Sequence, residues 1–139
     1  MTAYRALLTE TDIRRLMKAN DADERAAAAH KLCRSMDKAE LQGEDRESAQ
    51  KILRMLAQDA AELVRRAMAV TLKSSDLIPR DLARKLAADV DSVALPVIGF
   101  SPAFSDEDLI EIVWAGVPLR QVAVAGRPGV GRDVAKALA

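Results

Sequence analysis

A glycine-rich segment near the end of the chain, QVAVAGRPGVGRDVAKAL, has residue types and spacing that could bind a nucleotide phosphate. It reads as an apolar strand, a loop and a helix, with Gly126 and Gly131 at phosphate-loop spacing. That motif next requires a lysine for the phosphates and a hydroxyl for Mg²⁺, but Arg132 and Asp133 occupy these positions. Because Asp133 would place a carboxylate against phosphate, the segment favours a loop between two helices.

The single histidine, His30, has Cys33 three residues later, a spacing that could supply two metal ligands. The sequence holds no second pair of this kind, so a closed zinc site would need a partner chain. A Ser-His-Asp system is disfavoured too, because no nucleophile motif accompanies the histidine. We therefore expect a packed or half-exposed histidine, with no metal, no cofactor and no catalytic residue.

Four carboxylates lie close together at Asp106, Glu107, Asp108 and Glu111. Paired carboxylates can act as acid and base in glycoside cleavage. Here they occupy the first turns of an expected helix with Ser105 as its N-cap, where acidic side chains favour the helix dipole. The pattern therefore favours a structural role, and we expect that the protein is not an enzyme.

Charge is zero overall but unevenly spread along the chain. Residues 51–85 carry eight Lys/Arg against four Asp/Glu, residues 86–117 carry six acids and no base, and residues 118–139 carry four bases and one acid. Zero net charge argues against a general nucleic-acid binder, which needs a positive field. Nucleic-acid binding through the basic ridge of residues 51–85 is kept as the first alternative, and an unrecognised enzyme site as the second.

Five residues form the predicted interaction surface. Arg65 and Arg66, with Arg80 and Arg84 on the next expected helix, could contact an acidic partner protein. Trp114, at the end of LIEIVWAG, is either a core residue or an anchor on an open surface, and tryptophan is a frequent interface hot spot.

Length and composition indicate one soluble helical domain. The chain has 139 residues, half of them apolar, and Ala, Leu and Val dominate this half. The single cysteine excludes an internal disulfide and fits a reducing cytoplasm. The start, MTAYRALLTETDIRRL, lacks a signal-peptide core, and no apolar run approaches the roughly 20 residues of a membrane span. We expect a cytoplasmic protein without a membrane partner.

The expected helices repeat along the chain. LAQDAAELVRRAMAVTL begins at Leu56 and LAADVDSVALPVIGFS at Leu86, and each precedes a loop and a second helix. A third and less similar copy of the repeat is VPLRQVAVAGRPGVGRDVAKALA. A period of about 27–30 residues with two helices per unit is typical of an α-solenoid. Pro96 is interpreted as a residue that delays or kinks the start of its helix and sets the angle to the next layer.

Residues 56–139 resemble an uncharacterised bacterial family, domain of unknown function 2336, whose members look like HEAT-type helical repeats. The matching residues are Asp89, Val93, Ala94, Pro96, Val97, Ser101, Leu109, Ile110, Arg127, Pro128, Val134, Ala137 and Leu138. The resemblance implies a fold and brings no established activity. Because family members are usually longer, we expect the N-terminal piece of a larger protein, or an open end that packs on another copy.

The prediction is therefore an all-α fold: a short α-solenoid of HEAT-like stacked helix pairs at residues 51–139, preceded by N-terminal helices at residues 1–50, in a single domain. The predicted function is a non-catalytic protein–protein interaction or scaffold module. Its partner is another protein of unknown identity, with a homodimer as one arrangement and with nucleic acid disfavoured.

Overall fold

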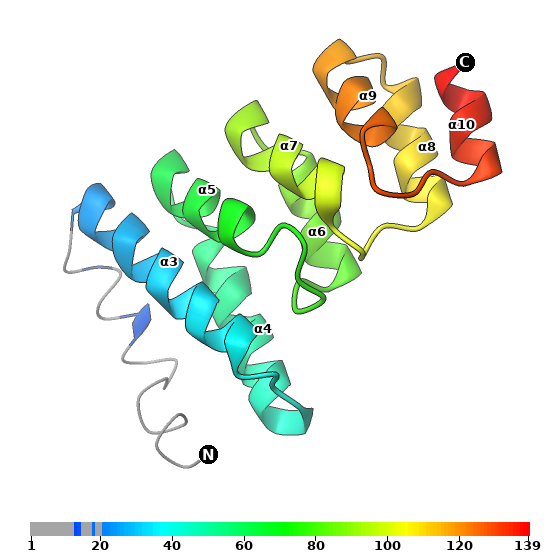
Figure 1. The fold of residues 1–139 in the computed structure, drawn as a ribbon. Helices are drawn as coiled ribbons and strands as arrows, with labels where there is room; N and C mark the ends of the chain where they lie inside the picture. Colours follow the sequence, from blue (N-terminus) through cyan, green and yellow to red (C-terminus); the bar gives the residue numbers. More distant parts are fainter. Residues whose placement is uncertain (1–12, 15–17, 19–20) are drawn as a thin grey trace. The chain divides into compact units, whose positions relative to one another are not determined.

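The computed structural model describes residues 13–14, 18 and 21–139, so most of the first twenty residues of the predicted N-terminal section lie outside it. The described residues form eight helices and no strand, which confirms the all-α prediction (Figure 1). The helices are α3 (Ala22–Lys38), α4 (Gly43–Leu56), α5 (Glu62–Thr71), α6 (Arg80–Ala87), α7 (Asp91–Phe100), α8 (Asp106–Trp114), α9 (Pro118–Ala125) and α10 (Arg132–Leu138). None of these helices has the length and apolar character needed to cross a membrane.

Two compact units divide the chain, and each is described by itself. Unit 1 comprises Met1–Thr71 and unit 2 comprises Leu72–Ala139. Helices α3, α4 and α5 belong to unit 1, and α6 to α10 belong to unit 2. The first predicted helix pair, α5 with α6, is thus divided between the two units.

Unit 1 is built around α5, which contacts both α3 and α4. Helix α3 begins after Asp21, whose carboxylate caps it by accepting a hydrogen bond from the Glu24 N–H at 2.8 Å. Helix α4 begins at Gly43, whose φ of 53° favours glycine. The side chains buried between the three helices include Cys33, Met36, Ile52, Leu53, Leu56, Val64 and Met68.

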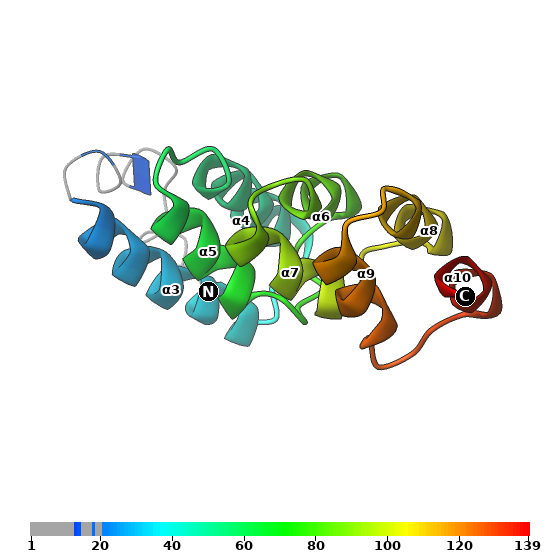
Figure 2. The same ribbon diagram turned by 90° about the horizontal axis from the view of Figure 1, so that it is seen from above.

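Unit 2 consists of five short helices around one apolar core. Helix α7 contacts α6 and α9, and α8 contacts α9 and α10. Figures 1 and 2 show α7 and α9 side by side, with α6 and α8 behind them. The core cluster contains Ala87, Ala94, Ile98, Leu109, Val113, Val124 and Val134.

The helices α6, α8 and α10 begin at equally spaced positions, Arg80, Asp106 and Arg132. The residue before each start has an extended backbone, with ψ between 162° and 166°. The starts of these three helices therefore recur at a constant interval along the sequence.

Pro96 lies in the interior of α7, which begins at Asp91, so the predicted delay of the helix start is wrong. The start is fixed upstream, where the Val90 carbonyl accepts from the N–H groups of Val93 and Ala94. An interior proline removes one helical hydrogen bond and costs about 3 kcal/mol. Burial offsets that cost here, because the α7 side chains of Val93, Ala94, Val97 and Ile98 lie in the core.

Two leucines of unit 2 differ in exposure and test this core. Leu86 is 1% exposed and Leu119 is 57% exposed. Leu86→Ala should lower the free energy of unfolding by about 2–5 kcal/mol, because it leaves a cavity. Leu119→Ala should change it by about 0.5 kcal/mol or less. Urea denaturation followed by circular dichroism measures both, and equal losses for the two variants would contradict the described packing.

Candidate interaction surface

Helix α9 turns its main polar side chain toward the rest of unit 2. The Arg120 guanidinium donates to the carbonyl of Ala87, at the end of α6, and to the carbonyl of Asp89 at 2.6 Å. It also forms an ion pair with the Asp91 carboxylate at 3.2 Å. These groups lie in and beside the α6–α7 loop, so Arg120 joins α9 to the preceding helix pair.

Two further polar side chains, one within α9 and one just after it, join this part of the chain to neighbouring helices. Gln121 donates from its amide nitrogen to the carbonyl of Val113 in α8 at 2.8 Å. Arg127, just after α9, donates to the carbonyls of Ile98 and Ser101 at 2.6 and 2.7 Å. Burial lowers the pKa of Arg127. The orphan carbonyls at the end of α7 thus receive partners from a charged side chain.

Apolar side chains occupy the outer side of the α8–α9 corner. Trp114 is 75% exposed, Val122 is 67% exposed, and Leu119 and Val117 are exposed as well. We call these four residues the apolar patch. Residues 114–119, WAGVPL, are all exposed and contain no charged side chain. Helix α9 therefore reverses the usual pattern, since polar groups hold it in place and apolar groups face solvent.

The tight connection between α8 and α9 keeps the patch together. Gly116 has a φ of 78°, a left-handed conformation that glycine adopts without steric cost. Val117 follows with an extended backbone, and Pro118 takes the first position of α9, where its missing N–H is tolerated. Three residues therefore connect the two helices, and only four residues separate Trp114 from Leu119 along the chain.

A buried carboxylate anchors the start of α8. Ser105 and Asp108 form a capping box: the Ser105 hydroxyl accepts from the Asp108 N–H at 3.2 Å, and the Asp108 carboxylate accepts from the Ser105 N–H at 3.0 Å. Arg80 of α6 donates to both oxygens of this carboxylate at 2.9 Å. Arg84 lies 3.6 Å from it. The capping predicted from the sequence is confirmed, and it also joins α8 to α6.

The environment of Asp108 favours its charged form. The hydrogen bond from Arg80 lowers the pKa of Asp108 to about 2, and the hydrogen bonds from Ser105 add to this against the opposing effect of burial. The side chain is 4% exposed. A lowering from 3.8 to about 2 corresponds to roughly 2 kcal/mol of stability in the charged state.

The predicted arginines belong to two different units. Arg65, in α5, donates to the carbonyls of Asp59 and Ala60 at 2.8 and 3.2 Å, and Arg66 is exposed. Arg80 and Arg84, in α6, bind the acids of α8 while about half of each side chain stays exposed. Three of the four predicted arginines thus take part in contacts within their own unit. Of the five residues predicted to form the interaction surface, only Trp114 belongs to the apolar patch.

The side chains of His30 and Cys33, both in α3, differ in their exposure to solvent. His30 is exposed, with its Nδ1 2.7 Å from the hydroxyl of Thr71. Cys33 is fully buried, and burial raises the pKa of its thiol to about 12. Such a thiol stays protonated and binds metal poorly. Among the described residues no group of three or more His, Cys, Asp or Glu side chains could hold a metal ion.

The remaining sequence candidates take structural positions. Asp106 and Glu107 are exposed in the first turn of α8, and Glu111 lies 3.5 Å from Arg84. The glycine-rich loop connects α9 to α10, with helices on both sides instead of the strand that a phosphate-binding loop needs. A pocket of about 160 Å³ in unit 2 has Arg84, Asp108 and Glu111 among its lining residues, and these are already joined by ion pairs.

Most of the apolar patch was missed by the sequence analysis. Trp114 was considered, but Val117, Leu119 and Val122 were not. A usable signal was present, because VWAGVPLRQVAVAG contains one charged residue in fourteen. The helical spacing of such apolar residues predicts that they lie in a core. In the structure Arg120 points toward the neighbouring helices instead, and the apolar side chains of the patch face solvent.

Asp108 gives this site a pH dependence that can be measured. Its charged form contributes stability above pH 3.8, and this contribution is lost as pH falls through about 2. Asp108→Asn should therefore destabilise the protein at pH 6 and flatten the fall in stability between pH 4 and pH 2. Thermal unfolding across this pH range measures the effect, with exposed Asp133→Asn as the matched control. An unchanged slope in Asp108→Asn would contradict this role.

Comparison with known proteins relates the C-terminal third of the chain to a protein family. No curated protein and no solved structure matches the chain. The model of a family described as "Uncharacterised protein conserved in bacteria (DUF2336)" matches residues 93–139, which include α8, α9 and the apolar patch. Residues 56–92 of the predicted resemblance lie outside the match. Residues 93–139 therefore match the uncharacterised bacterial family that the sequence predicts.

Proposed function

We propose that this chain is a non-catalytic protein-interaction module of the cytoplasm that binds another protein through the apolar patch. The observation that supports this proposal most is the 75% exposure of Trp114, together with the exposure of Leu119 and Val122 in the following helix. Contiguous exposed apolar surface is uncommon on monomeric proteins and marks interaction sites. Tryptophan is among the residues that most often dominate binding energy.

The scaffold proposed for this surface is a short stack of HEAT-like helix pairs. The equal spacing of the starts of α6, α8 and α10 supports it, as do the contacts of α7 with α9 and of α8 with α10. Stacked helical repeats form a long surface that binds partners, and each added repeat lengthens that surface. Arg120 and Arg127 hold α9 on its neighbours, so the patch is largely preformed and loses little entropy on binding.

The partner surface should be apolar at its centre and basic at one edge. Glu107, Glu111 and Trp114 lie at helical spacings of four and three residues along α8, and all three are exposed. The acidic side chains therefore continue the surface that Trp114 begins. Complementary charge at the edge of an interface mainly raises the association rate, and salt reduces it.

The two alternatives have less support. Arg65 and Arg80 make hydrogen bonds within their own units, which reduces the donors they can offer to nucleic-acid phosphates. The described acids at the start of α8 cap the helix or face solvent. These contacts favour protein binding over nucleic-acid binding or catalysis.

Substitutions in the patch should abolish capture of the partner. Tagged wild-type chain and the Trp114→Ala and Val122→Lys variants would be incubated with bacterial lysate, and captured proteins quantified by mass spectrometry. A protein held through a hot-spot tryptophan should be reduced about 30-fold or more, corresponding to roughly 2 kcal/mol. Val70→Lys is the matched control, because Val70 is an exposed helical valine of unit 1.

The outcome that contradicts the proposal is equal capture of the same proteins by all four chains. Self-association is distinguished by light scattering across protein concentration. A wild-type mass that doubles, with Val122→Lys remaining monomeric, identifies the partner as a second copy of the chain.

A further inference from the structure

Helix α9 lies along α7 and runs in the same direction. Near the start of α9, Arg120 forms an ion pair at 3.2 Å with Asp91, the first residue of α7. Just after the end of α9, Arg127 donates at 2.6 Å to the carbonyl of Ile98, near the end of α7. Figure 2 shows the two helices side by side. These contacts at both ends define how one helix of this unit is placed on another.

The side of α7 that α9 covers is marked by Ile98 and Gly99. Ile98 is fully buried and belongs to the same core cluster as Val124 of α9. A Cβ atom at Gly99 would lie 3.9 Å from the carbonyl oxygen of Ala123, so the backbones of the two helices approach each other closely here. The side of α7 that carries these two residues is therefore the side on which α9 packs.

The equivalent side of α9 is open to solvent. Counted from the first residue of each helix, Val122 and Ala125 of α9 correspond to Leu95 and Ile98 of α7. Leu95 is partly buried and Ile98 is fully buried. Val122, by contrast, is 67% exposed, and Ala125 is exposed as well. Helix α9 therefore presents to solvent the side that α7 buries beneath a neighbouring helix.

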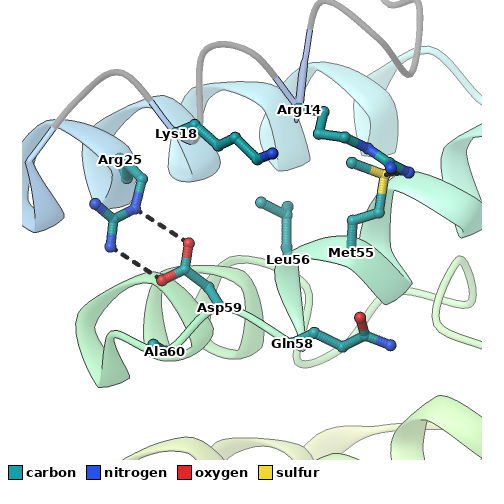
Figure 3. A pocket seen from close by; sticks show the side chains of 8 residues that line it. All are labelled: Arg14, Lys18, Arg25, Met55, Leu56, Gln58, Asp59 and Ala60. Carbon is teal, nitrogen blue, oxygen red and sulfur yellow. Dashed lines mark hydrogen bonds and ion pairs between the residues drawn. The ribbon is translucent and has the colours of Figure 1, made fainter.

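Arginine side chains join helical segments in both units. In unit 1 the Arg25 guanidinium donates to both carboxylate oxygens of Asp59 at 3.1 Å, which joins α3 to the loop before α5 (Figure 3). In unit 2 Arg120 and Arg127 hold α9 on its neighbours, and α9 contains no acidic residue. A helix that packs on α9 as α9 packs on α7 should therefore carry arginine at the edge of its contact.

The charge of the neighbouring helix α8 favours the same chemistry. Residues 106–117, which comprise α8 and its connection to α9, contain four acids and no base. Glu107 and Glu111 are exposed, and α8 contacts α9. Arg84 lies 3.5 Å from Glu111 and offsets its charge in part. The field at this corner attracts a cationic helix and repels an acidic one.

We infer that the apolar patch binds a short basic α-helix of another protein, which lies along α9 and covers Val122 and Ala125. This inference rests on the proposed function, because it names the kind of partner that the patch binds. Helices that bind in this way use apolar anchors at spacings of three and four residues. A helix fits better than an extended segment, because α9 itself covers the equivalent side of α7.

A peptide with the sequence of residues 117–127, which contain α9 and Arg127, is the probe. A hydrocarbon staple between the places of Pro118 and Val122, both exposed in the structure, keeps it helical. Fluorescence anisotropy of the labelled peptide should show saturable binding to the full wild-type chain. Val122→Lys and Ala125→Lys in the chain should each weaken binding about 10-fold or more, because each places a cation in the contact.

Matched controls separate this contact from general attraction between charges. Val70→Lys adds the same cation at an exposed helical valine of unit 1, and binding should stay within about twofold of wild type. A stapled peptide with glutamate at both arginine positions should bind at least about fivefold more weakly. Circular dichroism confirms that each variant chain is folded.

Failure of the arginine peptide to bind the wild-type chain overturns this inference, and so does equal binding of the arginine and glutamate peptides. The proposed function stands after either result if capture from lysate still depends on Trp114 and Val122, so the two failures are distinguishable. A chain that dimerises through Val122 and does not bind the peptide has a second copy on this surface, which also overturns the inference.

Discussion

Arginine side chains that bind the ends of neighbouring helices hold unit 2 together. Helices of seven to ten residues have few internal hydrogen bonds relative to their ends, where carbonyl and N–H groups lack helical partners. Arg120 supplies donors to the end of α6, and Arg127 supplies them to the end of α7. Asp108 closes the start of α8 and accepts from Arg80. Each of these contacts joins one helix to the next helix pair.

This arrangement explains why apolar residues of α9 face solvent. A helix that depended on burial for its place would turn Leu119 and Val122 inward. Here Arg120 and Gln121 fix α9 through carbonyls of other helices, and Val124 is its only buried side chain. The stability of the unit and its capacity to bind another protein are thus provided by different faces of the same helix.

Much of this fold could be predicted from sequence because it depends on local signals. The N-caps Asp21 and Ser105, the break at Gly43 and the all-helical pattern are set by neighbouring residues. Pro96 was misjudged, because the local cost of an interior proline is visible in sequence while the burial that offsets it is not. The patch was missed for a related reason. Its exposure depends on contacts between Arg120 and residues about thirty positions earlier.

The folded chain presents Trp114 to solvent. Trp114 is the only tryptophan of the sequence, so fluorescence excited beyond the absorption band of Tyr4 reports on it alone. Emission of the folded chain at low concentration should match that of free tryptophan in water, and acrylamide should quench it almost as efficiently as in the urea-unfolded chain. A blue-shifted emission that acrylamide barely quenches would show a buried Trp114 and would contradict this account of the surface.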